Sequence, residues 1–137
     1  MRRLRQLFYL SRADSKITEQ DVRQILLVAQ RNNRQKDITG CLLYSGAHFA
    51  QVLEGDAKAL DEVLGSIKND ARHHSIVVAL DHEVLERRFP DWSMGILYKL
   101  DMEDRVERLL VGDSEVRKRD AFGLFKDVSP DSVMGSL

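Results

Sequence analysis

Residues 38–55 read ITGCLLYSGAHFAQVLEG, and the fold can be predicted from the pattern of this segment. Its two halves, 38–45 and 48–55, are β-rich runs joined around Ser-Gly-Ala, which is typical of a β-hairpin. On both sides of the hairpin the apolar residues change to a spacing of three and four, which predicts a helix before it and another after it. A hairpin between two helices is the centre of the split β-α-β arrangement, so we expect a ferredoxin-like fold.

The elements outside the hairpin continue this order. Upstream, Thr18 is expected to cap the first helix, with Asp21 as a capping-box partner three residues on. Downstream, Pro90 interrupts regular structure before a last strand. The predicted elements are a strand at 4–11, a helix from Thr18 to about Asn32 or Asn33, the two hairpin strands, a helix opened by Gly55 and Asp56, a loop at 69–75 leading into a strand at 75–85, and a last strand at 92–100.

The predicted order β-α-β-β-α-β-β defines an α+β, ferredoxin-like sheet with two helices on one face. Residues 76–80 (IVVAL) are apolar at every position, which indicates that the sheet is covered on both faces. We expect a C-terminal helical extension at 101–137 to cover the second face of a core domain at 1–100. Its apolar residues are Met102, Val106, Leu109, Leu110, Phe122, Leu124 and Phe125.

The composition is typical of a compact intracellular protein. The 137 residues suit one domain, and 43% hydrophobic residues are enough for a core. The net charge of -1 gives no indication of nucleic-acid binding. Cys41 is the only cysteine, so neither an internal disulfide nor a cysteine-based zinc site can form. We see no signal peptide and no apolar run near the ~20 residues that span a membrane, and we expect a cytoplasmic protein.

Gln51 is an unusual residue for a buried strand. Because side chains alternate along a strand, Gln51 shares a face with Phe49 and Leu53, two large apolar neighbours. Burying an unpaired amide costs about 1–3 kcal/mol, so Gln51 needs hydrogen-bond partners. Tyr9 on the first strand and Asn33 on the buried stripe of the first helix are candidates. Two alternatives stay open: Tyr9 is a core residue with its hydroxyl at the rim, and Asn33 caps its helix.

Several short motifs resemble one known family. The motifs FYLS, QRNN, ITGCLLYSGAHFAQVLEG, DARHHS and RRFPDWSM occur in order along the chain. This series is similar to that of the BLUF family, the blue-light sensors that use FAD. The resemblance covers residues 4–100 and implies a ferredoxin-like sheet with the flavin ring inserted between its two helices. It makes 1–100 the photosensor domain and implies nothing about the residues beyond.

The resemblance also implies roles for individual residues. Tyr9 is the expected electron donor to the photoexcited flavin, and Gln51 is the expected switch residue between Tyr9 and flavin N5 and C4=O. Asn33 is expected to hold the C4=O/N3 edge of the ring. The remaining implied positions are Asn32 beside the ring, Ile25 and Ile67 lining it, Arg72 and His73 contacting it, Ser11 near the tyrosine, and Trp92 with Met94 as the pair on the last strand that relays the signal.

Two features depart from the family or stay unassigned. Ala29 and Asn32 stand where some members carry Ser and His, and we expect these changes to tune dark recovery without abolishing binding. The chain contains neither a Walker A motif nor GxGxxG, so its phosphate contacts are not identified by a motif. Nearby basic residues, Arg31, Arg34 and Lys36, are the candidates.

The sequence therefore predicts a blue-light receptor with no catalytic activity of its own. We expect it to signal to an unidentified partner protein, to form a homo-oligomer, and to bind neither nucleic acid, membrane nor metal. One alternative is a small acylphosphatase-type hydrolase, for which Arg12 would have to serve a phosphate-binding loop after the first strand. Another is a ligand-binding regulatory module without photochemistry.

Overall fold

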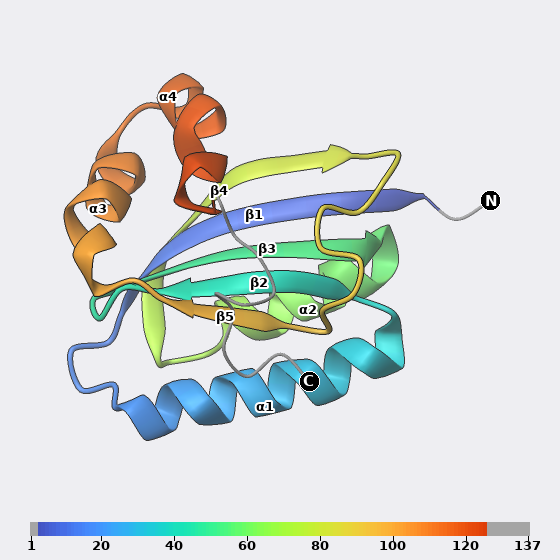
Figure 1. Ribbon diagram of the computed structural model, residues 1–137, viewed down its shortest axis with the longest axis horizontal. Helices are drawn as coiled ribbons and strands as arrows, with labels where there is room; N and C mark the ends of the chain where they lie inside the picture. The colour runs from blue at the N-terminus through green and yellow to red at the C-terminus, as the bar shows by residue number, and fades with distance from the viewer. Residues whose placement is uncertain (1–2, 126–137) are drawn as a thin grey trace.

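A five-stranded sheet in the order β4-β1-β3-β2-β5 forms the centre of the computed structural model (Figure 1), which describes residues 3–125. The elements are β1 (Leu4–Ala13), α1 (Glu19–Lys36), β2 (Thr39–Tyr44), β3 (His48–Asp56), α2 (Ala57–Lys68), β4 (His73–Glu83), β5 (Gly95–Tyr98), the 3-10 helix η1 (Leu100–Met102), α3 (Glu103–Val111), α4 (Ser114–Asp120) and the 3-10 helix η2 (Ala121–Phe125). This order confirms the ferredoxin-like, α+β prediction.

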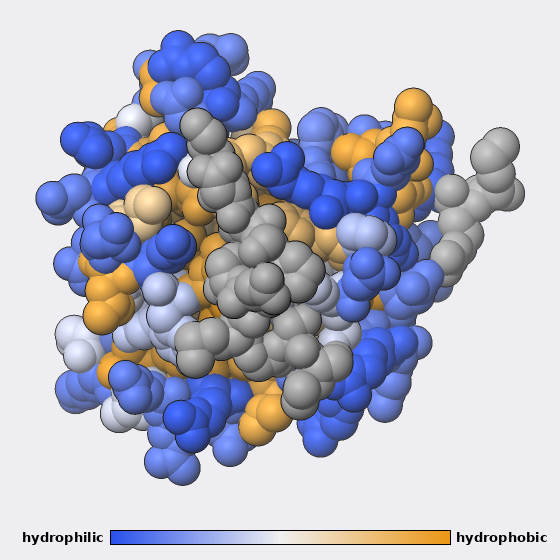
Figure 2. Space-filling model, viewed as in Figure 1, coloured by the Kyte–Doolittle hydropathy of each residue, from blue (hydrophilic) through white to orange (hydrophobic). Residues whose placement is uncertain are grey.

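Each face of the sheet carries its own apolar cluster. Val22 and Leu26 of α1 and Leu60 of α2 pack on one face. On the other face α3, α4 and η2 contribute a second cluster, whose buried members include Val106 and Phe125. The outer surfaces of α3 and α4 are mostly hydrophilic (Figure 2), although Val111 of α3 is exposed. The apolar residues of the cluster lie between these helices and the strands. The extension therefore covers the second face as predicted, and its residues 126–137 lie outside the described part of the chain.

The hairpin forms as predicted and sets the register of the sheet. The turn between β2 and β3 places Gly46 at φ 96°, in the left-handed region that favours glycine. β3 then pairs with β1 in antiparallel register, so that Tyr9 lies directly opposite Gln51. On the other side of β3, Leu42 of β2 is the neighbour of Gln51. Gln51 is thus at the centre of the sheet, on the face covered by α1 and α2.

The first helix is longer than predicted. The capping box between Thr18 and Asp21 is present at its start. Its end lies at Lys36 rather than at Asn32 or Asn33, because the intervening residues are good helix formers. Asp37 ends the helix in the left-handed conformation, φ 54°, and its N–H donates to the carbonyls of Arg34 and Asn33. The alternative that Asn33 caps the helix is therefore wrong, since Asp37 is the capping residue.

Two strand boundaries also differ from the prediction. β4 begins at His73, inside the predicted loop, because His73 and His74 pair with the end of β1. It is also an edge strand, and Val78 is exposed. β5 begins at Gly95, so Trp92 and Met94 precede the last strand instead of lying on it. None of the helices in 3–125 is both long and apolar enough to cross a membrane.

A buried carboxylate anchors the connection between β4 and β5, residues 84–94. Glu54 of β3 is 0% exposed and lies on the face of the sheet opposite to Gln51. Its two oxygens accept hydrogen bonds from Gln6 Nε2 at 2.7 Å and from the backbone N–H groups of Arg88 and Phe89, each at 2.8 Å. The connection is thereby fixed to the middle of the sheet.

We expect Glu54→Ala to lower the free energy of unfolding by about 2–4 kcal/mol, because it leaves buried N–H donors without an acceptor. Urea unfolding followed by circular dichroism measures this loss. Glu54→Gln keeps one acceptor oxygen and should cost less. Glu86→Ala, an exposed residue of the same connection, is the matched control and should change stability by less than about 0.5 kcal/mol. Equal stabilities for the Glu54→Ala and Glu86→Ala variants would contradict the anchoring role.

Candidate functional site

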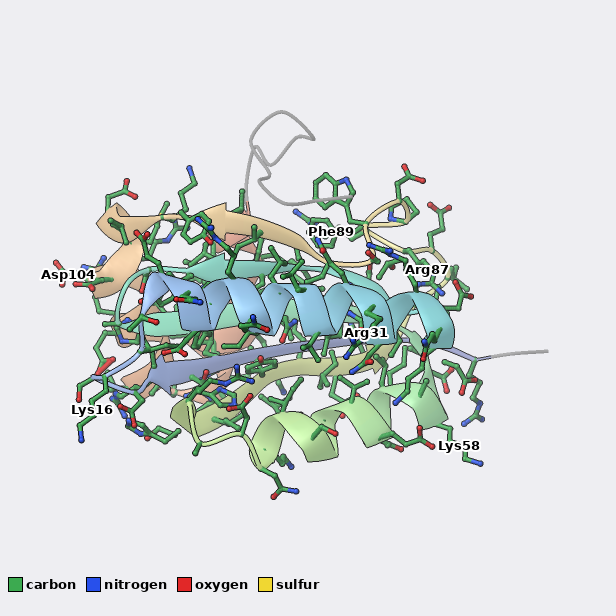
Figure 3. All side chains as sticks on the ribbon, turned by 90° about the horizontal axis from the view of Figure 1, so that it is seen from below. Lys16, Arg31, Lys58, Arg87, Phe89 and Asp104 are labelled. Atoms are coloured by element: carbon green, nitrogen blue, oxygen red, sulfur yellow. The ribbon has the colours of Figure 1, made fainter. Side chains whose placement is uncertain are left out.

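A pocket of about 170 Å³ lies between α1 and α2, above the sheet. Figure 3 shows these two helices side by side on this face, with Arg31 on α1 labelled between them. The structure brings most of the predicted site residues together here: Tyr9, Ile25, Asn32, Asn33, Gln51, Ile67, Arg72 and His73 all line the pocket. Ser11, Trp92 and Met94 are not among its lining residues.

Tyr9 and Gln51 form a buried polar pair at the floor of the pocket. Tyr9 Oη donates to Gln51 Oε1 at 2.5 Å, and the two residues are 4% and 5% exposed. Burial is the main cause that raises the pKa of Tyr9 well above its ordinary value, and the negative charge of the nearby Asp70 carboxylate raises this pKa further. The phenol therefore stays protonated at neutral pH and remains a hydrogen-bond donor to the amide.

The other end of the Gln51 amide points to Met94. Gln51 Nε2 donates to Met94 Sδ at 3.3 Å, and Met94 is fully buried in the cluster beneath α1 and α2. Trp92 instead packs against the cluster on the opposite face, where its ring stacks on Phe89 at a centroid distance of 5.5 Å. The pair expected on one strand is thus divided between the two faces of the sheet.

The amides of α1 lie along one side of the pocket. Asn33 lines it and donates from Nδ2 to the backbone carbonyl of Ser93 at 2.9 Å. Asn32 also lines the pocket and is exposed. The two consecutive amides therefore differ: both line the pocket, but only Asn33 is buried and binds the end of the 84–94 connection.

The end of the pocket beside α2 is charged. Arg72 forms an ion pair with Asp70, Nη2 to Oδ2 at 2.6 Å, which lowers the pKa of the Asp70 carboxyl. Sequence reasoning missed Asp70, although its position two residues before Arg72 was a signal for such a pair. His73 Nε2 lies 2.7 Å from the carbonyl of Ile67, which can only accept, so Nε2 carries a proton. Ser11 Oγ lies 2.8 Å from His73 Nδ1, so Ser11 hydrogen-bonds to the imidazole ring of His73 without lining the pocket itself.

Of the three basic phosphate candidates, only Lys36 lines the pocket. Its Nζ lies 3.5 Å from Glu62 Oε2, an exposed ion pair that joins α1 to α2. Arg34 Nε instead contacts Ser93 Oγ at 3.5 Å. Lys36 and Arg34 therefore contact different partners and do not form one phosphate-binding cluster.

The position of Arg12 does not support the alternative prediction that this protein is an acylphosphatase-type hydrolase. This residue belongs to β1, and its Nη2 is bound to Glu107 of α3 at 2.5 Å. The loop that follows, 14–18, contains no arginine. Within 3–125, no three His, Cys, Asp or Glu side chains are grouped so that they could hold a metal ion.

The shape and chemistry of the pocket suit a flavin ring. Ile25 on α1 and Ile67 on α2 supply aliphatic side walls, while Asn33 and Gln51 supply amides that both donate and accept. A flat heteroaromatic ring needs this combination, apolar contact for its faces and hydrogen bonds for its edge. The site is thus a pocket between two helices of a ferredoxin-like domain, suited in its lining to a flat ring and placed beside a buried tyrosine–glutamine pair.

The comparison with known proteins identifies the family. The family model described as BLUF, sensors of blue-light using FAD, matches residues 4–95. The chain belongs to the BLUF family, whose members sense blue light with FAD.

Curated relatives match over the same part of the chain. The blue light- and temperature-regulated antirepressor BluF of Escherichia coli (strain K12) is 35% identical over 88 residues, 64% of this chain and 22% of that protein. Photoactivated adenylate cyclase subunit beta of Euglena longa is 35% identical over 89 residues, 64% of this chain and 10% of that protein. The chain thus spans less than a quarter of the length of these relatives.

Solved structures of similar length share the fold. BlrB, a BLUF protein in its dark state, matches with a TM-score of 0.71 and 34% identity, over 91% of this chain and 89% of that one. The photo-activated state of BlsA matches with a TM-score of 0.76 and 26% identity, over 92% of this chain and 97% of that one. These two matches extend beyond residue 95 and so include helices of the extension.

Proposed function

We propose that this chain senses blue light through a switch formed by Tyr9 and Gln51 beside FAD. The observation that carries this proposal is the buried hydrogen bond from Tyr9 Oη to Gln51 Oε1, next to a pocket between two helices. Asn32 and Asn33 would hold the edge of the ring, Ile25 and Ile67 its faces, and Arg72 and His73 the end beside α2.

The chemistry of the switch follows from the two side chains. Bound FAD absorbs blue light, and its excited state is a strong one-electron oxidant. Tyr9 would give an electron to the excited flavin, and its hydroxyl, now much more acidic, would release its proton along the existing hydrogen bond to Gln51 Oε1; when the electron returns, the proton would return to Tyr9 as well. An amide has a donor end and an acceptor end, so rotation or tautomerisation of Gln51 reverses the hydrogen-bond pattern around it.

This reversal would also change a contact outside the pocket, the hydrogen bond from Gln51 to Met94. In the structure Gln51 Nε2 donates to Met94 Sδ, so an amide that has turned over withdraws that donor. Met94 lies at the end of the 84–94 connection, next to Trp92, which contacts the face covered by the extension. We propose that this connection relays the change of state as a shift between two conformations of the protein.

The output is proposed to pass to a separate protein. α3, α4 and η2 pack on the sheet, and the outer surfaces of α3 and α4 are mostly hydrophilic (Figure 2). We therefore propose a cytoplasmic, non-enzymatic sensor that acts through a partner or through a change of homo-oligomeric state. The division into a photosensor domain at 1–100 and an extension at 101–137 belongs to the same proposal.

An absorption spectrum recorded before and after blue light tests the proposal. We expect a yellow protein that releases FAD on heating and shows a small red shift of its flavin bands, which reverses in the dark. The shift arises because extra hydrogen-bond donation to the ring lowers the energy of its excited state. Red light, which flavin does not absorb, is the control. A colourless protein that FAD cannot reconstitute, or a spectrum unchanged by blue light, would refute the proposal.

A further inference from the structure

The backbone bends sharply just before β5. Trp92 and Met94 are two residues apart, a spacing that in a strand places both side chains on the same face. Here they lie on opposite faces, Met94 beneath α1 and α2 and Trp92 against Phe89. The chain must therefore turn over at Ser93, and this turn explains why β5 begins at Gly95.

Two buried amides of α1 hold this bend. Gln30 Nε2 donates to the carbonyl of Met94 at 2.9 Å, and Asn33 Nδ2 donates to the carbonyl of Ser93 at 2.9 Å. Gln30 and Asn33 are three residues apart, so they share one face of the helix, and each is only 2% exposed. Gln30 and Asn33 thus bind two successive backbone carbonyls that lie about 60 positions away in the sequence. We call these two hydrogen bonds the clamp.

Without the clamp, the segment has a ready alternative. Trp92 and, in β5, Ile96 and Tyr98 have high strand propensity. The backbone at Trp92 already lies beside β2, because Gly40 N–H donates to its carbonyl at 3.0 Å. Straightening of the short stretch at Ser93 would extend β5 back to Trp92 and place Trp92 on the same face as Met94.

We infer that Gln30 is a positioning residue, which together with Asn33 holds the bend at Ser93 and so keeps Met94 against Gln51 and Trp92 on the opposite face. This inference rests on the proposed switch. When Gln51 turns over, the Met94 sulfur loses its hydrogen-bond donor. The hydrogen bond from Gln30 to the Met94 backbone carbonyl remains, and it still favours the position that Met94 has in the dark. Gln30 therefore sets how readily the dark state re-forms, without contacting the ring.

The test replaces Gln30 by Met, which has a similar length and flexibility but no donor. Gln24→Met is the matched control, because Gln24 lies on the same helix and is exposed. Loss of the hydrogen bond from Gln30 to the Met94 carbonyl should slow dark recovery by about fivefold, while FAD binding and the light-induced shift are retained. In FAD-free protein, amide hydrogen exchange at residues 93–95 should be about fivefold faster than in wild type.

Trp92 supplies a second readout, because it is the single tryptophan of the chain. In the dark, its fluorescence in the FAD-bound Gln30→Met variant should be more strongly quenched than in wild type, as the ring spends more time on the side of the pocket. Gln30→Glu separates donation from packing, since its carboxyl group donates only when it is protonated. Its recovery should resemble that of the Met variant at high pH and approach that of wild type as the pH falls.

The outcomes separate this inference from the proposed function. A wild-type protein without a light-induced shift refutes the switch, while hydrogen exchange in FAD-free protein still tests the clamp. A normal shift together with unchanged exchange and recovery in the Gln30→Met variant overturns the role of Gln30 alone. Equal effects of Gln30→Met and Gln24→Met overturn it as well.

Discussion

Tyr9→Phe is expected to bind FAD, to remain yellow and to show no light-induced shift at all. Phenylalanine keeps the ring that packs in the core but removes the hydroxyl, the only polar atom of the side chain. Burial keeps the Tyr9 phenol protonated, so in the wild-type protein an electron and a proton can both leave from this one residue. Phenylalanine is far harder to oxidise and has no acidic proton, and Gln51 Oε1 loses its donor.

Difference spectra under blue light measure this effect, with FAD content determined on the same sample. Tyr44→Phe is the matched control. Tyr44 is buried in the same cluster, but its hydroxyl donates to the backbone carbonyl of Gly46 and not to Gln51. The control should keep its full photocycle. A red shift of normal size in Tyr9→Phe would show that another residue is the donor.

The centre of the site could be predicted from the sequence because strand geometry is simple. A period of two fixed which residues of 48–55 share a face, and this placed Gln51 among apolar neighbours that require it to have partners. Antiparallel pairing of the first strand with the hairpin then brought Tyr9 opposite Gln51. The buried stripe of α1 likewise predicted that Asn33 faces the same space.

The connection from 84 to 94 could not be predicted in the same way. Local propensity favours a strand beginning at Trp92, and this prediction is wrong because Gln30 and Asn33 bind the successive carbonyls of Met94 and Ser93. Such contacts join residues far apart in the sequence and leave no periodic signal. The anchoring by Glu54 is another contact of this kind.

β3 fixes the 84–94 connection from both faces of the sheet. On one face Gln51 contacts the side chain of Met94, and on the other Glu54 holds the backbone at Arg88 and Phe89. The two contacts differ in what light can do to them. The Glu54 carboxylate accepts in either state, whereas in the proposed switch the Gln51 amide changes the group that it presents to Met94, so we expect motion at the Met94 end of the connection and a fixed Phe89 end.

Gln51→Leu is expected to bind FAD in the dark and to lose the light-induced shift. Leucine matches the apolar neighbours Phe49 and Leu53 and fills a similar volume, so the pocket should keep its shape. It can neither accept the proton from Tyr9 nor exchange a donor for an acceptor, which are the two properties that the switch requires. Tyr9 can still lose an electron, but with no rearranged hydrogen bond the electron returns and the starting state is restored.

Steady-state difference spectra and light-minus-dark hydrogen exchange at residues 92–98 measure the two parts of this loss. Gln24→Leu, the same change at an exposed position of α1, should retain both signals. A normal red shift in Gln51→Leu would refute the assignment of the switch to this amide. A lost shift with a retained change in exchange would instead show that the signal reaches Met94 by a route other than Gln51, because leucine cannot withdraw a donor from the sulfur.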